Sequence, residues 1–330
     1  MKLSDELEAV KTSNDNLERL SEIFFECFGI RVGKDYFNWK YLGNPAGEVV
    51  AFEAVNSSNR EIAAFYGIIP EKYMVHGKEM VVYQSMDTMT HPRYQKRGLF
   101  IKLANITYDY AAERDGKLYL LGIPGMSSFP GFVNKLAWIN SCNFSYLFSH
   151  RAMLTGYGLL RPSGGISLQP IDSFDASADE FFANKENSKP IYKVYNKEVL
   201  NWKVTNHPFQ KFRSFKILQQ GAMIGLLIVL PEGDKVKVFY CDFLKNEQRK
   251  YLNAVMRKLA RYVPFKYVYT WENTDAEMNR AYRKAGFLVN RRAKGPFTYK
   301  VPFIVHARDA AGTEQWLKAD NFELHPLIQD

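Results

Sequence analysis

The chain has 330 residues, of which 46% are hydrophobic, so it is long enough for two globular domains of about 150 residues each. Its net charge of +9 indicates an anionic partner, but no helix-turn-helix, zinc-finger or RNA-binding motif accompanies the basic residues, which argues against nucleic acid. No apolar run reaches the ~18 residues of a membrane span and the acidic N-terminus is no signal peptide, so we expect a cytoplasmic protein that binds no membrane.

The first informative pattern along the chain joins a strand to a helix. Residues 81–90 are rich in β-branched and aromatic side chains and hold no glycine or proline, which predicts a strand that Pro92 ends. From Leu99 to Ala112, apolar side chains recur at three- and four-residue spacing, which predicts an amphipathic helix. The loop between these two elements is basic and contains Gly98.

This loop has the chemistry of a phosphate cradle. Gly98 lies near the predicted helix N-terminus, where backbone N–H groups have no intrahelical partner and the helix dipole is positive. A pyrophosphate can be bound there largely by the main chain, with Lys96 and Arg97 adding charge and the glycine allowing close approach. The alternative is a basic turn that opens a helix and meets only water.

The loop sequence also resembles a known signature. Gln95-Lys96-Arg97-Gly98-Leu99-Phe100 is similar to the Q/R-x-x-G-x-G/A motif with which the GNAT superfamily of N-acyltransferases binds acetyl-CoA. The resemblance implies that these six residues contact acetyl-CoA as a co-substrate. Phe100 departs from the pattern, because glycine or alanine usually stands there.

The next predicted elements continue the resemblance. Residues 118–124 are typical of a buried strand, and a short helix is expected before Trp138. In GNAT proteins the two strands splay apart, and the pantetheine arm pairs with the first strand, which implies cofactor contacts for Met89 and Thr90. Ser127 and Ser128 follow the second strand and are also expected to contact the cofactor, although a helix N-cap would explain a serine equally well.

The reaction that the resemblance implies needs few catalytic groups, since the amine attacks the thioester directly once both are held in line. Asp87 is the candidate base, with His91 and then Glu53 behind it. A strand-end capping role for Asp87 and a turn role for His91 are the alternatives. Many family members carry a tyrosine that protonates the thiolate, but Val133 occupies that position here.

The chain also repeats itself in a constant order. Asn38-Trp39-Lys40 recurs as Asn201-Trp202-Lys203, and the apolar segment 62–70 is echoed by 223–231. Asp87 then corresponds to Asp242, and the glycine loop corresponds to residues 248–252. Tyr251 replaces the glycine there, so we expect only the first half to bind the cofactor.

These observations predict an α/β fold of two tandem GNAT-like domains, each a mixed, splayed β-sheet flanked by helices. We place an acetyl-CoA-binding domain at residues 1–155 and a degenerate one at 156–330, with a C-terminal tail from about 301. The predicted activity is acetyl transfer from acetyl-CoA to a primary amine of a small molecule, an amino sugar being one candidate. The alternative is an inactive module that binds CoA or another ligand. Cys27, Cys142 and Cys241 are widely spaced and odd in number, so we expect free thiols and no metal site.

Overall fold

The computed structural model of the protein describes residues 1–159, 164–290, 300–308 and 316–329. The chain forms two compact units. The first unit comprises residues 1–73, 79–142 and 302–319, and the second comprises 74–78, 143–301 and 320–330. Among the described residues, no helix is both long and apolar enough to cross a membrane. The three cysteines are free thiols, as predicted.

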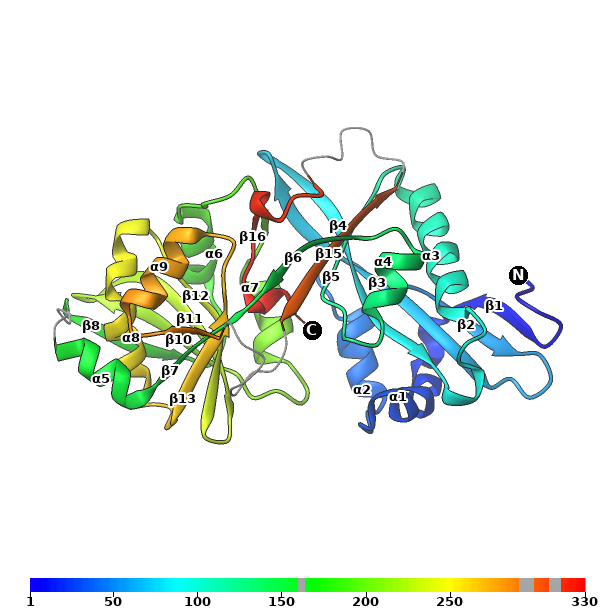
Figure 1. The fold of residues 1–330 in the computed structure, drawn as a ribbon, viewed down its shortest axis with the longest axis horizontal. Helices are drawn as coiled ribbons and strands as arrows, with labels where there is room; N and C mark the ends of the chain where they lie inside the picture. Colours follow the sequence, from blue (N-terminus) through cyan, green and yellow to red (C-terminus); the bar gives the residue numbers. More distant parts are fainter. Residues whose placement is uncertain (160–163, 291–299, 309–315, 330) are drawn as a thin grey trace. The chain divides into compact units, whose positions relative to one another are not determined.

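The first unit is built on a mixed sheet with the order β1-β2-β3-β4-β5-β15-β6 (Figure 1). The first three strands pair antiparallel, whereas β4 and β5 are parallel. Its strands are β1 (Leu7–Lys11), β2 (Val50–Asn56), β3 (Ile62–Val75), β4 (Lys78–Thr90), β5 (Leu118–Gly122), β6 (Ile139–Phe144) and β15 (Val301–Arg308). Its helices are η1 (Asn14–Arg19), α1 (Leu20–Phe28), α2 (Lys34–Phe37), η2 (Asn38–Leu42), η3 (Pro92–Tyr94), α3 (Leu99–Asp115) and α4 (Phe129–Lys135).

The predicted strand and helix on either side of the basic loop are both confirmed, as β4 and α3. The apolar stripe of α3 buries Leu99, Leu103 and Tyr108 in one core with Tyr66 of β3 and Ile304 of β15. This packing fixes the direction of α3, and therefore the place at which its N-terminus meets the loop.

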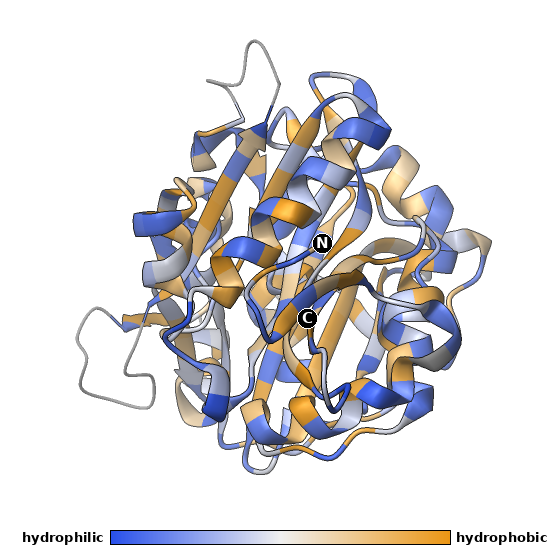
Figure 2. Cartoon of the chain, turned by 90° about the vertical axis from the view of Figure 1, so that its right-hand side faces the viewer, coloured by the Kyte–Doolittle hydropathy of each residue, from blue (hydrophilic) through white to orange (hydrophobic). Residues whose placement is uncertain are grey.

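The second unit repeats this architecture in the order β8-β10-β11-β12-β13-β7-β14, with β12 and β13 parallel. Its strands are β7 (Tyr146–His150), β8 (Ile166–Ile171), β10 (Arg213–Gln219), β11 (Ala222–Glu232), β12 (Lys235–Phe243), β13 (Tyr267–Trp271) and β14 (Leu288–Asn290), with a small pair of β9 (Ile191–Lys193) and β16 (Phe322–Glu323). Its helices are α5 (Arg151–Leu159), α6 (Ala176–Asn184), α7 (Lys197–Leu200), η4 (Asn201–Thr205), η5 (Asn246–Tyr251), α8 (Leu252–Leu259), α9 (Ala276–Lys284) and η8 (Pro326–Ile328). Figure 2 shows the apolar residues gathered along the strands, as expected for sheets buried under helices.

The sequence repeat coincides with a repeated local structure. Asn38–Leu42 and Asn201–Thr205 are both π-helical, and each follows a four-residue α-helix. Because π-helix is rare, its presence at both copies of the Asn-Trp-Lys motif supports the predicted duplication. Lys40 and Lys203 of the two copies are both buried.

The boundaries of the units differ from the predicted ones. In the first unit β15, from the C-terminal part of the chain, lies between β5 and β6, and in the second unit β7 lies between β13 and β14. The boundary expected near residue 155 instead falls inside α5 of the second unit. Residues 301–308 of the predicted tail form β15, a strand of the first sheet. A stretch that contains one proline and two glycines, residues 161–165, follows the predicted boundary and lies partly outside the described residues. The alternation of side chains along a strand does not show which sheet the strand will join. The placement of β15 in the first sheet and of β7 in the second therefore could not be predicted from the residues of these strands.

Candidate functional site

The basic loop has an open backbone at the start of α3. Gly98 is the N-cap of α3 with φ +71°, and Lys96 is also left-handed at φ +63°. Gln95 N–H donates to Pro92 O and Lys102 N–H donates to Gly98 O, but no backbone N–H of residues 96–101 donates to an acceptor in the described part of the chain. A run of unpaired donors at a helix N-terminus is the arrangement that binds phosphate oxygens.

The side chains of the loop divide into two groups. Gln95, Lys96 and Arg97 are exposed, and the Arg97 guanidinium lies over the Tyr94 ring, 3.4 Å from a Glu6 carboxylate oxygen. Leu99 is buried in the core of the first unit. The exposed charges of the loop are therefore available to an anion, while Leu99 anchors the helix beneath it.

Phe100, the departure from the family pattern, turns into the core. Its ring packs 4.9 Å from the ring of Phe132 on α4 and 5.8 Å from that of Tyr66. A Cβ atom at Gly131 would lie only 2.5 Å from this ring, so the two helices are closely packed here. The bulky residue thus fills the space between α3 and α4.

The expected splay of the two strands is confirmed. β4 and β5 pair only at Tyr83–Leu120 and Gln84–Leu121, yet β4 continues to Thr90. Residues 85–90 therefore have no ladder partner on β5, which leaves a strand edge that an extended ligand could pair with. Met89 is buried in this segment, and the Thr90 carbonyl accepts a hydrogen bond from the Gln95 side chain at 3.4 Å.

The two predicted bases are held by other groups. Asp87 sits in a left-handed conformation at φ +44°, and its carboxylate accepts hydrogen bonds from Lys40 Nζ at 3.0 Å and from the Tyr41 hydroxyl at 2.7 Å. His91 caps η3, where its Nδ1 accepts from the Arg93 N–H at 3.2 Å, and its Nε2 lies 3.9 Å from a Glu61 oxygen. Both side chains thus have structural partners in the first unit.

The third candidate base, Glu53, is less strongly paired. It is buried on β2, and burial raises its pKa, while the nearest guanidinium, that of Arg19, is 3.6 Å away.

The two serines predicted to contact the cofactor lie at the start of α4. Ser128 forms no side-chain N-cap bond on α4; its hydroxyl donates to the Gly125 carbonyl at 3.3 Å. Ser127 is exposed. Ser128 therefore occupies the N-cap position of α4 without capping it through its side chain, and both hydroxyls lie in the segment after β5.

Sequence reasoning missed a chain of hydroxyl groups under α3. The Tyr66 hydroxyl is 2.8 Å from Ser85 Oγ and 2.6 Å from the Tyr108 hydroxyl, which also accepts from Trp138 Nε1 at 3.1 Å. Burial raises the pKa of both tyrosines, so they stay neutral hydrogen-bonding groups. Val133, at the position of the family's tyrosine, only packs against this core. No spacing in the sequence joins these residues, because they come from β3, β4, α3 and the loop before β6.

The corresponding loop of the second unit has a different structure. Residues 246–251 are wound into η5, which runs directly into α8, and Tyr251 has an ordinary φ of −85°. The Tyr251 hydroxyl accepts from the Gln219 side chain at 2.8 Å. As predicted from the replaced glycine, residues 246–251 do not form an open backbone cradle like the one before α3.

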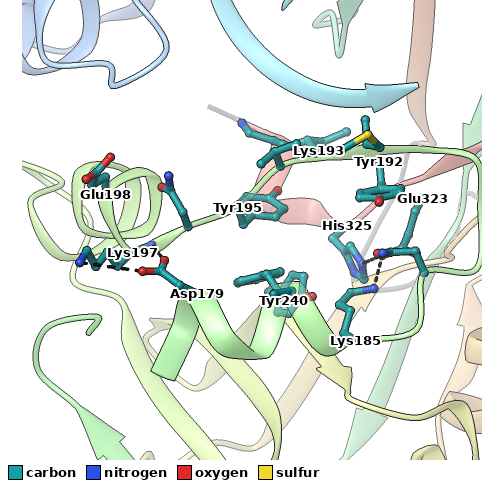
Figure 3. A pocket seen from close by; sticks show the side chains of 17 residues that line it. Asp179, Lys185, Tyr192, Lys193, Tyr195, Lys197, Glu198, Tyr240, Glu323 and His325 are labelled. Carbon is teal, nitrogen blue, oxygen red and sulfur yellow. Dashed lines mark hydrogen bonds and ion pairs between the residues drawn. The ribbon is translucent and has the colours of Figure 1, made fainter. Parts of the chain in front are cut away.

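The second unit contains a cavity of about 400 Å³ (Figure 3). Its wall includes the rings of Phe182, Tyr192, Tyr195 and Tyr240. No pattern in the sequence predicted this cavity, because Glu323, His325 and Ile328 of the predicted C-terminal tail help to line it.

At one end of this cavity Lys185 joins two buried carboxylates. Its Nζ lies 2.6 Å from Glu323 and 3.1 Å from Asp242, and His325 Nε2 is 3.5 Å from Glu323. Burial opposes the charge of Lys185, but the two carboxylates raise its pKa above the ordinary value. The side chains of Asp242, Glu323 and His325 are close enough together to hold a metal ion, but the Lys185 ammonium already supplies positive charge to both carboxylates.

Asp242 corresponds to Asp87 in the repeat, and both carboxylates pair with a lysine. Because the pairing also occurs in the unit without a glycine loop, it is better explained by packing at the end of the strand than by cofactor chemistry. This weakens the case for Asp87 as a base.

Comparisons with known proteins agree with this geometry. Residues 9–138 match the family model described as acetyltransferase (GNAT) domain. No protein with a curated description matches the chain. Among solved structures, a probable N-acyltransferase of unknown function from Enterococcus faecalis is 12% identical, with a TM-score of 0.67 over 92% of this chain and 72% of that one.

Two further solved structures share the fold. A GCN5-related N-acetyltransferase from Anabaena variabilis is 12% identical with a TM-score of 0.66, over 91% of this chain and 72% of that one. Saccharomyces cerevisiae N-myristoyltransferase, solved with bound myristoyl-CoA and inhibitors, is 13% identical with a TM-score of 0.62, over 93% of this chain and 82% of that one. At this level of identity the likeness concerns the fold.

Proposed function

The protein belongs to the GNAT superfamily, with a GNAT acetyltransferase domain at residues 9–138, and from this premise we propose that it is an acyl-CoA-dependent N-acyltransferase. The observation that supports this most is the loop before α3, where the N–H groups of residues 96–101 are unpaired beside the basic side chains of Lys96 and Arg97. The unpaired edge of β4 at residues 85–90 continues from this loop, which suits the extended arm of CoA.

The finer assignment is acetyl transfer from acetyl-CoA to a primary amine of a small molecule, an amino sugar being one candidate. The amine nitrogen attacks the thioester carbonyl carbon, the carbon–sulfur bond breaks, and the thiolate receives a proton. Asp87 and His91 stay the proposed proton acceptors, although Lys40 and Tyr41 already engage both oxygens of Asp87. We therefore attribute most of the rate to positioning by the loop and the free edge of β4.

Calorimetric titration of acetyl-CoA tests the cofactor site. Tyrosine at Gly98 would place a side chain on a left-handed residue at the mouth of the loop, so we expect affinity to fall at least about tenfold in Gly98→Tyr. Gly116→Tyr is the matched control, because Gly116 ends the same helix with φ +79°, is exposed and has equally open space around it. Its affinity should stay within about twofold of wild type.

Equal affinities for all three proteins, or no binding to wild type, would remove the cofactor site from this loop. Myristoyl-CoA titrated in parallel measures acyl preference, because the yeast neighbour was solved with that ligand.

The second candidate function is a CoA-binding module without turnover. It is favoured by Val133, which offers no hydroxyl for the leaving thiolate, and by the engaged carboxylate of Asp87. A thiol-release assay with acetyl-CoA and a panel of primary amines separates the two. Release of free CoA that depends on an added amine supports the enzyme, whereas tight binding without release across the panel supports the module.

A further inference from the structure

The chain of hydroxyl groups under α3 runs from the core of the first unit to the edge of β4 that the splay leaves free. Trp138, Tyr108 and Tyr66 are buried, whereas Ser85 on β4 is half-buried. Consecutive polar atoms of the chain, from Trp138 Nε1 to Ser85 Oγ, lie 3.1, 2.6 and 2.8 Å apart. Ser85 directly follows Gln84, the last residue of β4 that pairs with β5. The chain therefore ends where the free edge begins.

The direction of these hydrogen bonds follows from the donors and acceptors present. The indole N–H of Trp138 only donates, so the Tyr108 oxygen accepts from it. Burial raises the pKa of Tyr66 and of Tyr108, so each hydroxyl keeps its own proton. Among the described residues, the Tyr66 oxygen is the acceptor within hydrogen-bond distance of the Tyr108 hydroxyl. If Tyr66 donated to Tyr108 instead, the buried Tyr108 O–H would have no acceptor, which is unfavourable.

The chain therefore delivers a hydrogen-bond donor to Ser85. Tyr108 donates to Tyr66, and Tyr66 donates to the Ser85 oxygen. The proton of the Ser85 hydroxyl then has no acceptor in the described part of the protein. Because each hydroxyl in such a chain polarises the next one, the Ser85 O–H is a stronger donor than an isolated serine hydroxyl.

The proposed cofactor would bring its thioester to this end of the edge. The Gln95 side chain donates to the Thr90 carbonyl, which keeps the basic loop beside the other end of the free edge. A diphosphate at the loop therefore directs the pantetheine arm along β4 from Thr90 towards Ser85. Residues 85–90 extend over at most roughly 17 Å. The arm has about twelve bonds between diphosphate and sulfur and extends over roughly 14 Å, so its sulfur lies near the Ser85 end.

We propose that Ser85 is a catalytic residue that donates a hydrogen bond to the sulfur of the leaving thiolate, with Tyr66 and Tyr108 as positioning residues; this inference rests on the proposed function. As the amine nitrogen bonds to the carbonyl carbon, the carbon–sulfur bond breaks and its electron pair goes to sulfur. The Ser85 hydroxyl stabilises this charge and keeps its own proton. The thiolate then takes a proton from solvent, which balances the proton that the amine loses. Ser85 thus supplies the hydrogen bond that Val133 cannot.

The thiol of bound CoA reports this hydrogen bond without any amine acceptor. CoA that carries carbon-13 next to the sulfur is bound to the full-length protein, and its chemical shift is followed as the pH rises, which gives the pKa of the thiol. A donor to the thiolate lowers this pKa. We expect Ser85→Ala to raise the thiol pKa by about 1, and Tyr66→Phe to raise it by a smaller amount because Ser85 loses its donor. Ser85→Thr keeps the hydroxyl and should restore the wild-type value.

The matched control is Thr88→Ala. Thr88 is a half-buried hydroxyl residue on the same free edge, outside the hydroxyl chain, so the thiol pKa should stay within about 0.2 of wild type. Calorimetry at pH 7, where the thiol is protonated, should give CoA affinities within about twofold of wild type for all variants. This combination separates a bond to the thiolate from a general distortion of the site, which would weaken binding.

The outcomes distinguish this inference from the proposed function. If CoA binds and Ser85→Ala leaves the thiol pKa unchanged, or if Thr88→Ala raises it equally, the role of Ser85 is refuted and the cofactor site stands. An unchanged thiol pKa in Tyr66→Phe refutes the positioning role of the hydroxyl chain. A wild-type protein that binds no CoA refutes the proposed function, and the inference about Ser85 is refuted with it.

Discussion

Replacing Lys185 by methionine tests the buried charge network of the second unit. The side chains of Lys185, Asp242 and Glu323 are 2%, 2% and 6% exposed, and Lys185 Nζ lies within 3.1 Å of both carboxylates. Methionine has a similar length but no charge, so the variant leaves two carboxylates buried without this partner. Removing one member of a buried ion pair costs about 3–5 kcal/mol, and we expect a loss in this range at pH 7.

The effect should depend on pH with a definite sign. In the folded protein burial works against the charge of Glu323, but the hydrogen bond with His325 and the charge of Lys185 keep its pKa well below the ordinary value. Such a carboxylate stabilises the wild type above its unfolded pKa of about 4.3, and this contribution is lost as the pH falls below that value. Without Lys185, burial raises the folded pKa, so protonation relieves the variant at a higher pH. The difference between the two proteins should shrink between pH 7 and pH 5.

Urea unfolding followed by circular dichroism and tryptophan fluorescence measures both quantities. Lys197→Met is the matched control, because Lys197 pairs with Asp179 in the same unit at 3.9 Å and the two side chains are 46% and 39% exposed. Its loss should be about 0–1 kcal/mol. Adding Glu323→Gln to Lys185→Met should recover part of the stability. A loss in Lys185→Met no larger than in the control, or one that does not vary with pH, would refute this account of the network.

Two further predictions concern the first unit. Asp87→Asn leaves the Lys40 ammonium buried without its carboxylate, so the free energy of unfolding in urea should fall by about 3 kcal/mol. If Asp87 is also the base, turnover should fall about 100-fold or more at unchanged affinity for acetyl-CoA. A variant with full stability and full turnover would contradict both roles. Tyr108→Phe removes the acceptor of Trp138 Nε1–H in the core and should cost about 1–3 kcal/mol in the same assay, whereas an unchanged urea midpoint would mean that the hydroxyl chain does not stabilise the fold.

The sequence by itself predicted the elements that depend on near neighbours. β4, α3 and the left-handed glycine between them follow from residue types within about twenty positions, because strand propensity, helix periodicity and freedom at positive φ are local properties. The duplication could also be predicted, since the Asn-Trp-Lys motif and the segments after it recur in the same order. The structure adds that both copies of the motif fold into the same π-helical turn.

Only the tertiary structure decided which distant parts meet. β15 enters the first sheet between β5 and β6, and Glu323 meets Lys185 across 138 positions of the chain. The partners of Asp87 likewise come from Lys40 and Tyr41, on elements that sequence reasoning had not connected with it. An apolar strand fits either sheet and a carboxylate suits any nearby cation, so the choice depends on how the whole core packs, and no local pattern records it.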